Sequence, residues 1–186
     1  MPDRARLSPA RLFLAVWPDP ETRSWLAEAG RWVEAHWGGR PSRPETLHLT
    51  LVFIGPLERT RLDALRQALS NLRAPPFELT LDRLACWRHN RIAYLAPSEP
   101  PEALIELVTA LERRLDGLSM DYDHRPYAPH VTLARKVPCP PSSTALDLGS
   151  NLPTWSVRSF DLVESVPTPT GVRYAGVARQ GLAGPA

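Results

Sequence analysis

Two short stretches of the sequence carry the same pattern, His-x-Thr-Leu. They are HLTL, which begins at His48, and HVTL, which begins 82 residues later at His130. Both lie in apolar, β-rich surroundings that predict strands over 47–55 and 127–137. Successive side chains of a strand point to opposite faces, so the histidine and threonine of each copy share one face. The apolar residues of the motif lie on the other face and would anchor the pair in the core. Each copy therefore offers an imidazole and a hydroxyl on a rigid support.

Two histidines that face one pocket could act as a general acid and a general base. An unperturbed histidine pKa near 6.5 makes both protonation states available around neutrality. Such a pair suits a displacement at phosphorus, in which one side chain removes a proton from the nucleophile and the other protonates the leaving oxygen. Threonine hydroxyls could bind the non-bridging phosphate oxygens, and an arginine could neutralise the developing charge. We expect a bell-shaped pH profile with both limbs near neutrality. A single His-x-Thr is usually part of a half-polar sheet face, but its duplication favours a functional role.

Length and composition predict one soluble domain that spans residues 1–186. The chain is 43% apolar and 23% charged, and no segment predicts a membrane span or a secretory signal, so we expect a cytoplasmic monomer. A net charge of +2 does not indicate nucleic-acid binding by bulk electrostatics. Of the 22 basic residues only Lys136 is a lysine, which suits two-point binding of phosphate but also fits a codon bias. Cys86 and Cys139 are expected to be reduced and structurally incidental.

The order of predicted elements repeats once along the chain. The first half is expected to contain a strand at 11–18, a helix at 19–37, a strand at 47–55 that stops at Gly55-Pro56, a helix at 57–72 and a strand at 76–87. The second half is expected to contain a strand at 91–98, a helix at 99–115, a strand at 127–137, a short helix within 140–150, and strands at 155–166 and 171–179. This repeat predicts an internal duplication. The predicted fold is α+β, with two pseudo-symmetric lobes of about residues 11–90 and 91–180. Each lobe would be an antiparallel β-sheet with helices on its outer face, with a cleft between the lobes and room for the chain to cross from one to the other.

Three segments together carry a family resemblance: RLFLAVWP near the start, LHLTLVFIG, and RPYAPHVTLARK. In this order they resemble the landmarks of the two-histidine (2H) phosphoesterase superfamily, and within it the RNA 2′,3′-cyclic phosphodiesterase family, once described as 2′-5′ RNA ligases. The resemblance covers roughly residues 11–179. It implies a cofactor-free, metal-independent opening of a 2′,3′-cyclic phosphate at an RNA end to leave a 2′-phosphomonoester.

The resemblance also implies a role for five residues. His48 would be the general acid that protonates the departing 3′ oxygen, and His130 the general base that activates water. Thr50 and Thr132 would bind the phosphate, and Arg135 would serve the substrate phosphate. The implied partner is RNA with a 2′,3′-cyclic phosphate end, with tRNA fragments and small cyclic nucleotides as examples.

Regular strand geometry conflicts with the role of Arg135. Arg135 lies five positions after His130, an odd separation that puts the two side chains on opposite faces of a regular strand. It can join the site only if the strand twists, bulges or ends between them.

Other residues and other functions remain open on the sequence alone. Core packing or base stacking suits Phe13, Trp32 and Tyr127; solvent exposure is expected for His36, His89 and His124; and RNA phosphate contact or a solvated surface suits Arg43 and Arg125. One alternative function is a zinc site that includes both motif histidines, for which a third ligand is not evident. The others are joining of RNA halves through a 2′-5′ linkage at the same site, and binding of RNA ends without turnover.

Overall fold

The computed structural model describes residues 8–140, 152–169 and 171–184. The short helix expected within 140–150 falls, apart from Pro140, outside the described residues. None of the described helices is long and apolar enough to span a membrane.

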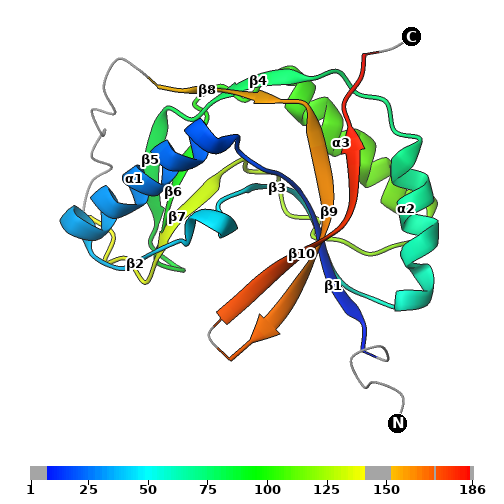
Figure 1. Ribbon diagram of the computed structural model, residues 1–186, viewed down its shortest axis with the longest axis horizontal. Coiled ribbons are helices and arrows are strands. Elements are labelled where there is room, and N and C mark those ends of the chain that lie inside the picture. Colours follow the sequence, from blue (N-terminus) through cyan, green and yellow to red (C-terminus); the bar gives the residue numbers. More distant parts are fainter. Residues whose placement is uncertain (1–7, 141–151, 170, 185–186) are drawn as a thin grey trace.

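The described residues form a mixed structure of three α-helices and antiparallel sheets (Figure 1). The helices are α1 (Pro20–Trp37), α2 (Leu62–Ser70) and α3 (Glu102–Gly117), with short 3-10 turns at Pro44–Thr46 and Arg59–Arg61. The strands are β1 (Ala10–Val16), β2 (Arg40–Pro41), β3 (Leu49–Leu57), β4 (Phe77–Thr80), β5 (Arg83–Trp87), β6 (Ile92–Ala96), β7 (Val131–Arg135), β8 (Thr154–Val157), β9 (Ser159–Thr168) and β10 (Gly171–Gly181). The main sheet has the order β10-β9-β1-β3-β7-β6-β5, and β2 pairs with β7 outside this path. Strands β4 and β8 form a separate pair.

The two motif strands, β3 and β7, are neighbours at the centre of this order. They are antiparallel and share one residue pair, Leu49 with Val131. Beyond that pair β7 is bonded instead to the chain that precedes β3, since Ser42 N donates to Leu133 O over 2.7 Å. Strands from the two halves of the sequence also interleave, because β9 pairs with β1 and β5 pairs with β6.

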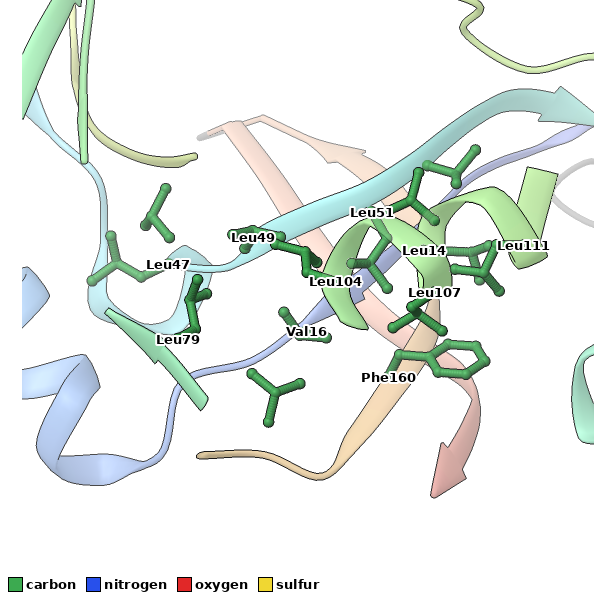
Figure 2. Packing of buried hydrophobic residues seen from close by; sticks show 14 of the residues in the cluster. Leu14, Val16, Leu47, Leu49, Leu51, Leu79, Leu104, Leu107, Leu111 and Phe160 are labelled. Atoms are coloured by element: carbon green, nitrogen blue, oxygen red, sulfur yellow. The ribbon is translucent and has the colours of Figure 1, made fainter. Parts of the chain in front are cut away.

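The apolar side of the motif strands packs against helices. Helix α1 begins at the cap residue Asp19, whose side chain accepts a hydrogen bond from Thr22 N over 2.8 Å. Its buried face contacts β7 so closely that a Cβ on Gly30 would lie 3.3 Å from Leu133 O. Helix α3 places Leu104 and Leu107 in the same cluster as the apolar residues of β1 and β3 (Figure 2). Burying such leucines contributes roughly 1.5–3 kcal/mol each, so this core fixes the sheet from behind.

Several predicted elements have different bounds from those expected. The strand at 127–137 is shortened to β7, and the helix at 57–72 begins only at Leu62, after a 3-10 turn. The strand predicted at 76–87 is two strands, because the chain changes sheets at Asp82. The Asp82 carboxylate accepts hydrogen bonds there from the backbone N (2.6 Å) and the hydroxyl of Ser98. Before it β4 pairs with β8, and after it β5 pairs with β6. The strand at 155–166 is likewise divided into β8 and β9. The stop predicted at Gly55-Pro56 is wrong, because Gly55 takes a φ of 82° within a bulge and β3 continues to Leu57.

The expectation of reduced, incidental cysteines is also wrong. Cys86 at the end of β5 and Cys139 after β7 form a disulfide, with their Cα atoms 5.7 Å apart. Both segments adjoin β6, which pairs with β5 on one side and β7 on the other. Because this proximity arises from sheet order, the separation of 53 residues in the sequence does not reveal it.

Candidate active site

Each motif histidine lies immediately before the first residue of its strand. The Leu49 and Val131 pair is antiparallel, so extending its register by one residue on either side places His48 across from Thr132 and Thr50 across from His130. Both histidines and both threonines line one pocket of 360 Å³. The two copies of the motif therefore meet, and each imidazole lies beside a hydroxyl of the other copy.

The two imidazoles are held in the same way by the backbone. Nδ1 of His48 lies 2.7 Å from the carbonyl oxygen of Thr46, and Nδ1 of His130 lies 2.7 Å from that of Ala128. A carbonyl only accepts, so in each neutral ring Nδ1 carries the proton and Nε2 keeps its lone pair. Nε2 of His48 is 3.2 Å from the hydroxyl oxygen of Thr50. Both rings therefore offer Nε2 as the atom that can take up or release a proton.

Aromatic rings surround each histidine. The ring centroid of His48 lies 5.0 Å from Phe13, 5.2 Å from Trp17 and 5.1 Å from Tyr174. The ring of His130 lies 4.5 Å from Trp87 and 5.7 Å from Tyr94. These rings form small apolar clusters on the open face of the sheet, separate from the main core. They pack around the imidazole rings, which remain half-buried.

This environment favours the neutral form of both histidines in the free protein. Burial lowers the pKa of His48 from 6.5 to about 4, opposed by its hydrogen bond to Thr46 O and assisted by the positive charges of His130 and Arg135. Burial also lowers the pKa of His130, opposed by its bond to Ala128 O and assisted by Arg135. The pKa of each motif histidine is therefore lowered from the ordinary value of 6.5 that the sequence argument assumed.

Arg135 reaches the pocket because β7 bulges. Residues Ala93–Tyr94 of β6 pair with Ala134 and Thr132, which leaves Leu133 as an extra residue in β7. Leu133 and Ala134 are consequently both buried, and the alternation of faces restarts one position later. Arg135 then returns to the face of Thr132 and lines the pocket with both histidines. The odd separation from His130 is thus compensated by one bulged residue.

The same bulge occurs at the equivalent position of the first motif, its last residue. In β1, Leu14 and Ala15 pair with Val52 and Thr50, which leaves Leu51 as the extra residue in β3. Phe53 therefore occupies the place in β3 that Arg135 occupies in β7. The two halves of the pocket are alike in backbone and differ here in chemistry.

The pocket draws on five strands and includes residues that the sequence did not single out. Its lining is Arg11, Phe13, Ser42, Thr46, His48, Thr50, Phe53, His130, Thr132, Arg135, Ser165, Val172 and Tyr174. A second pocket of 480 Å³ adjoins it on the side of His130 and shares Thr50, Phe53, His130, Thr132 and Arg135 with it. Tyr174 and Trp87 lie outside every motif of the sequence, and Arg11 and Trp17 lie in the first resemblance segment but were given no role there. Arg11 and Tyr174 line this pocket, Trp87 lines the second pocket, and Trp17 contacts the ring of His48.

The lesser candidates fall in several places. Phe13 lines the pocket, whereas Trp32 stacks on His36 within α1 at a centroid distance of 4.0 Å. Tyr127 donates from its hydroxyl to Thr50 O over 3.2 Å, and burial raises its pKa. His89 and Arg125 line the second pocket, and Arg125 also forms an ion pair with Asp123. His124 lies near Asp121. The side chain of Arg43 donates a hydrogen bond to Val172 O over 2.5 Å. Across residues 8–140, 152–169 and 171–184, no group of three or more His, Cys, Asp or Glu side chains gathers where a metal could be held.

Comparisons with known proteins place this fold in a family. A model of the 2′-5′ RNA ligase superfamily matches residues 18–165, and the chain belongs to this family of two-histidine phosphoesterases. The RNA 2′,3′-cyclic phosphodiesterase of Escherichia coli is 31% identical over 179 residues, which cover 94% of this chain and 97% of that protein. The protein of the same name from Thermus thermophilus is 31% identical over 185 residues, covering 94% and 91%. The structure of E. coli LigT complexed with 3′-AMP superposes with a TM-score of 0.76 at 30% identity, covering 94% of this chain and 98% of that one. The resemblance drawn from the motifs is thus confirmed.

Proposed function

We propose that this protein opens 2′,3′-cyclic phosphates at RNA ends to 2′-phosphomonoesters by acid-base catalysis with two histidines and no metal. The observation that carries the proposal is the meeting of His48 and His130 at one pocket with Thr50, Thr132 and Arg135. Relatives named RNA 2′,3′-cyclic phosphodiesterase, which match nearly the whole chain, support the same activity.

The proposed reaction is a single displacement at phosphorus. Nε2 of His130 takes a proton from water as the water oxygen bonds to phosphorus. The bond from phosphorus to the 3′ oxygen breaks, and His48 gives that oxygen a proton. Thr50 and Thr132 donate hydrogen bonds to the non-bridging oxygens, and Arg135 stabilises the added charge. The product keeps its phosphate on the 2′ oxygen, and proton exchange with solvent restores both imidazoles.

The acid form of His48 depends on the substrate. In the free protein its pKa of about 4 leaves it neutral at pH 7. A bound phosphodiester places a negative charge beside the imidazole, which opposes the positive charge of Arg135 and favours the imidazolium. Substrate binding and protonation of the acid are therefore coupled in this proposal.

A second candidate is transfer to a 5′-hydroxyl of another RNA strand in place of water, which forms a 2′-5′ linkage. The pocket of 480 Å³ beside His130 favours it, because an attacking water occupies only about 30 Å³. The same base would then deprotonate the 5′-hydroxyl. Hydrolysis remains the first proposal, since it needs no second substrate.

We also propose that the fold consists of two related lobes that face this pocket. The support is the repeated strand, helix and motif-strand order and the equivalent bulges at the last residue of each motif. Interleaving of β5 and β9 between the halves fits a chain that crosses from one lobe to the other.

The decisive experiment incubates the protein with 2′,3′-cyclic AMP in the presence and absence of EDTA and identifies the hydroxyl that keeps the phosphate. We expect 2′-AMP at the same rate in both. Loss of activity in EDTA would favour a metal site instead. Intact affinity for the cyclic nucleotide without any product would favour a binding module.

A further inference from the structure

An arginine outside the two motifs lies at the rim of the same pocket. Arg11, an exposed residue of β1, places its guanidinium carbon 4.9 Å from the centroid of the Phe53 ring. A cation over an aromatic face is held by the ring quadrupole, and the planar guanidinium can stack there without using its hydrogen-bond donors. The side chain is therefore positioned while its N–H groups stay available.

Nothing in the described ranges of the chain occupies those donors. Within residues 8–140, 152–169 and 171–184 Arg11 forms neither an ion pair nor a hydrogen bond through its side chain. The acid on the adjoining strand, Glu164, pairs with Leu12 and so lies on the other face, where Arg59 contacts it over 2.5 Å. A guanidinium without a carboxylate beside a phosphate-binding pocket is suited to bind a second anion.

The position of Arg11 relative to the motifs fits an extended RNA end. Across β1 and β3, Phe13 is paired with Phe53 and Ala15 is paired with Thr50. The two pairs are two residues apart along β1, a separation of roughly 7 Å. Arg11 reaches Phe53 from further along the same strand. A ribose and base attached to the reacting phosphate at Thr50 would lie over Phe13 and Phe53, and the next phosphate would follow beyond them.

The equivalent bulges explain why this cation comes from β1. In the second motif, Arg135 lies two residues after the bulged Leu133 and lines the pocket with both histidines. In the first motif the same place holds Phe53, which supports a guanidinium from a neighbouring strand instead. Two arginines from different strands, Arg11 of β1 and Arg135 of β7, thus line the pocket.

We propose that Arg11, supported by Phe53, binds the phosphodiester that precedes the terminal nucleotide of an RNA ending in a 2′,3′-cyclic phosphate. The inference rests on the proposed function and extends it, because it makes an RNA end of two or more nucleotides a better substrate than a cyclic mononucleotide.

The test compares three substrates: 2′,3′-cyclic AMP, a diadenylate that ends in a 2′,3′-cyclic phosphate, and the same dinucleotide with an uncharged methylphosphonate linkage. We expect Arg11→Ala to reduce the preference in kcat/KM for the charged dinucleotide over cyclic AMP by about tenfold, the scale of one hydrogen bond to a charged group. The methylphosphonate should cost the wild-type protein the same factor and cost Arg11→Ala nothing further. The dependence of log kcat/KM on log salt should fall by about 0.7 for the charged dinucleotide in the variant.

Arg113→Ala is the matched control, since Arg113 is an exposed arginine of α3 outside the pocket. The proposal would be overturned if Arg11→Ala kept the wild-type preference for the charged dinucleotide over cyclic AMP. This includes the case in which kcat/KM falls by the same factor on both substrates. If Arg11→Ala does not fold, the wild-type comparison of the two linkages decides. Should the wild-type protein turn over none of the substrates, the proposed function fails, and equilibrium binding of the two dinucleotides to both proteins still tests the role of Arg11.

Discussion

Raising the pH tests the electrostatics of the site most directly. In the proposed mechanism the productive free protein carries one proton on the histidine pair. Burial, however, lowers the pKa of His48 to about 4 and that of His130 below its ordinary 6.5. Protonating His48 in the free protein therefore costs about 3 kcal/mol more than in water. At pH 7 only about one molecule in 10³ carries that proton on His48.

The expected profile follows from these values. Because kcat/KM reports groups of the free enzyme, it should decrease about tenfold for each pH unit above 6.5, or about 100-fold between pH 6.5 and 8.5. The alkaline limb of kcat should lie at higher pH, since the bound phosphate raises the pKa of His48. Either assignment of acid and base gives this profile, so the measurement tests the buried environment rather than the roles.

The assay measures initial rates with 2′,3′-cyclic AMP well below KM, from pH 4 to 9 at constant ionic strength. A control at saturating substrate gives kcat in the same buffers. If kcat/KM stayed level from pH 6.5 to 8.5, or reached its maximum above pH 7.5, the inference that burial and Arg135 depress both pKa values would be refuted.

Four further predictions concern the same site and its support. His48→Ala and His130→Ala should each lower kcat at least about 10²-fold with unchanged circular dichroism. An aryl phosphodiester, whose leaving group needs no proton, should restore activity to His48→Ala only. A wild-type rate in either variant would remove that residue from the mechanism. Arg135→Lys should lose at least about tenfold in kcat/KM, because an ammonium cannot form the two-point contact; equal rates would show that charge alone suffices. The lowered pKa of His48 stabilises the folded state above pH 6.5, and this contribution is lost as the pH falls through about 4. The free energy of unfolding should therefore decrease by about 3 kcal/mol between pH 6.5 and pH 4. His48→Gln should flatten this pH dependence, and an unaltered dependence in urea titrations would argue against a lowered pKa of His48. Replacing Cys86 and Cys139 with serine should lower the free energy of unfolding by at most about 4 kcal/mol, as the loop between them spans 53 residues; identical denaturation midpoints with and without reductant would contradict a stabilising disulfide.

The sequence predicts the elements of this fold better than their connections. The buried-strand and helix patterns correctly indicate β1, α1, β6 and α3, because local periodicity and the cap at Asp19 determine them. The division of 76–87 into β4 and β5 depends on Asp82, which bonds to Ser98 sixteen residues away. The disulfide likewise depends on strand order. Such long-range contacts leave no local periodicity to detect.

The site shows the same distinction. The paired motifs predict that His48 and His130 lie at one pocket, because a repeated tetrapeptide implies equivalent positions. Arg135 could not be placed by counting, since one extra residue at Leu133 reverses the alternation of faces. Tyr174 comes from β10, and its contact with His48 follows from the pairing of β9 with both β1 and β10. Bulges and strand order are therefore what the sequence leaves undetermined.

The single residue pair between β3 and β7 has a mechanical consequence. At most positions of a sheet, a ladder of backbone hydrogen bonds sets the spacing of neighbouring strands, but here the chain at Ser42 takes over that ladder directly beside the motifs. The strands that carry His48 and His130 are therefore held together by that one pair and by the apolar packing of α1 and α3 behind the sheet. In the proposed mechanism, the alignment of the two imidazoles therefore depends on apolar packing behind the sheet as well as on the polar groups of the pocket.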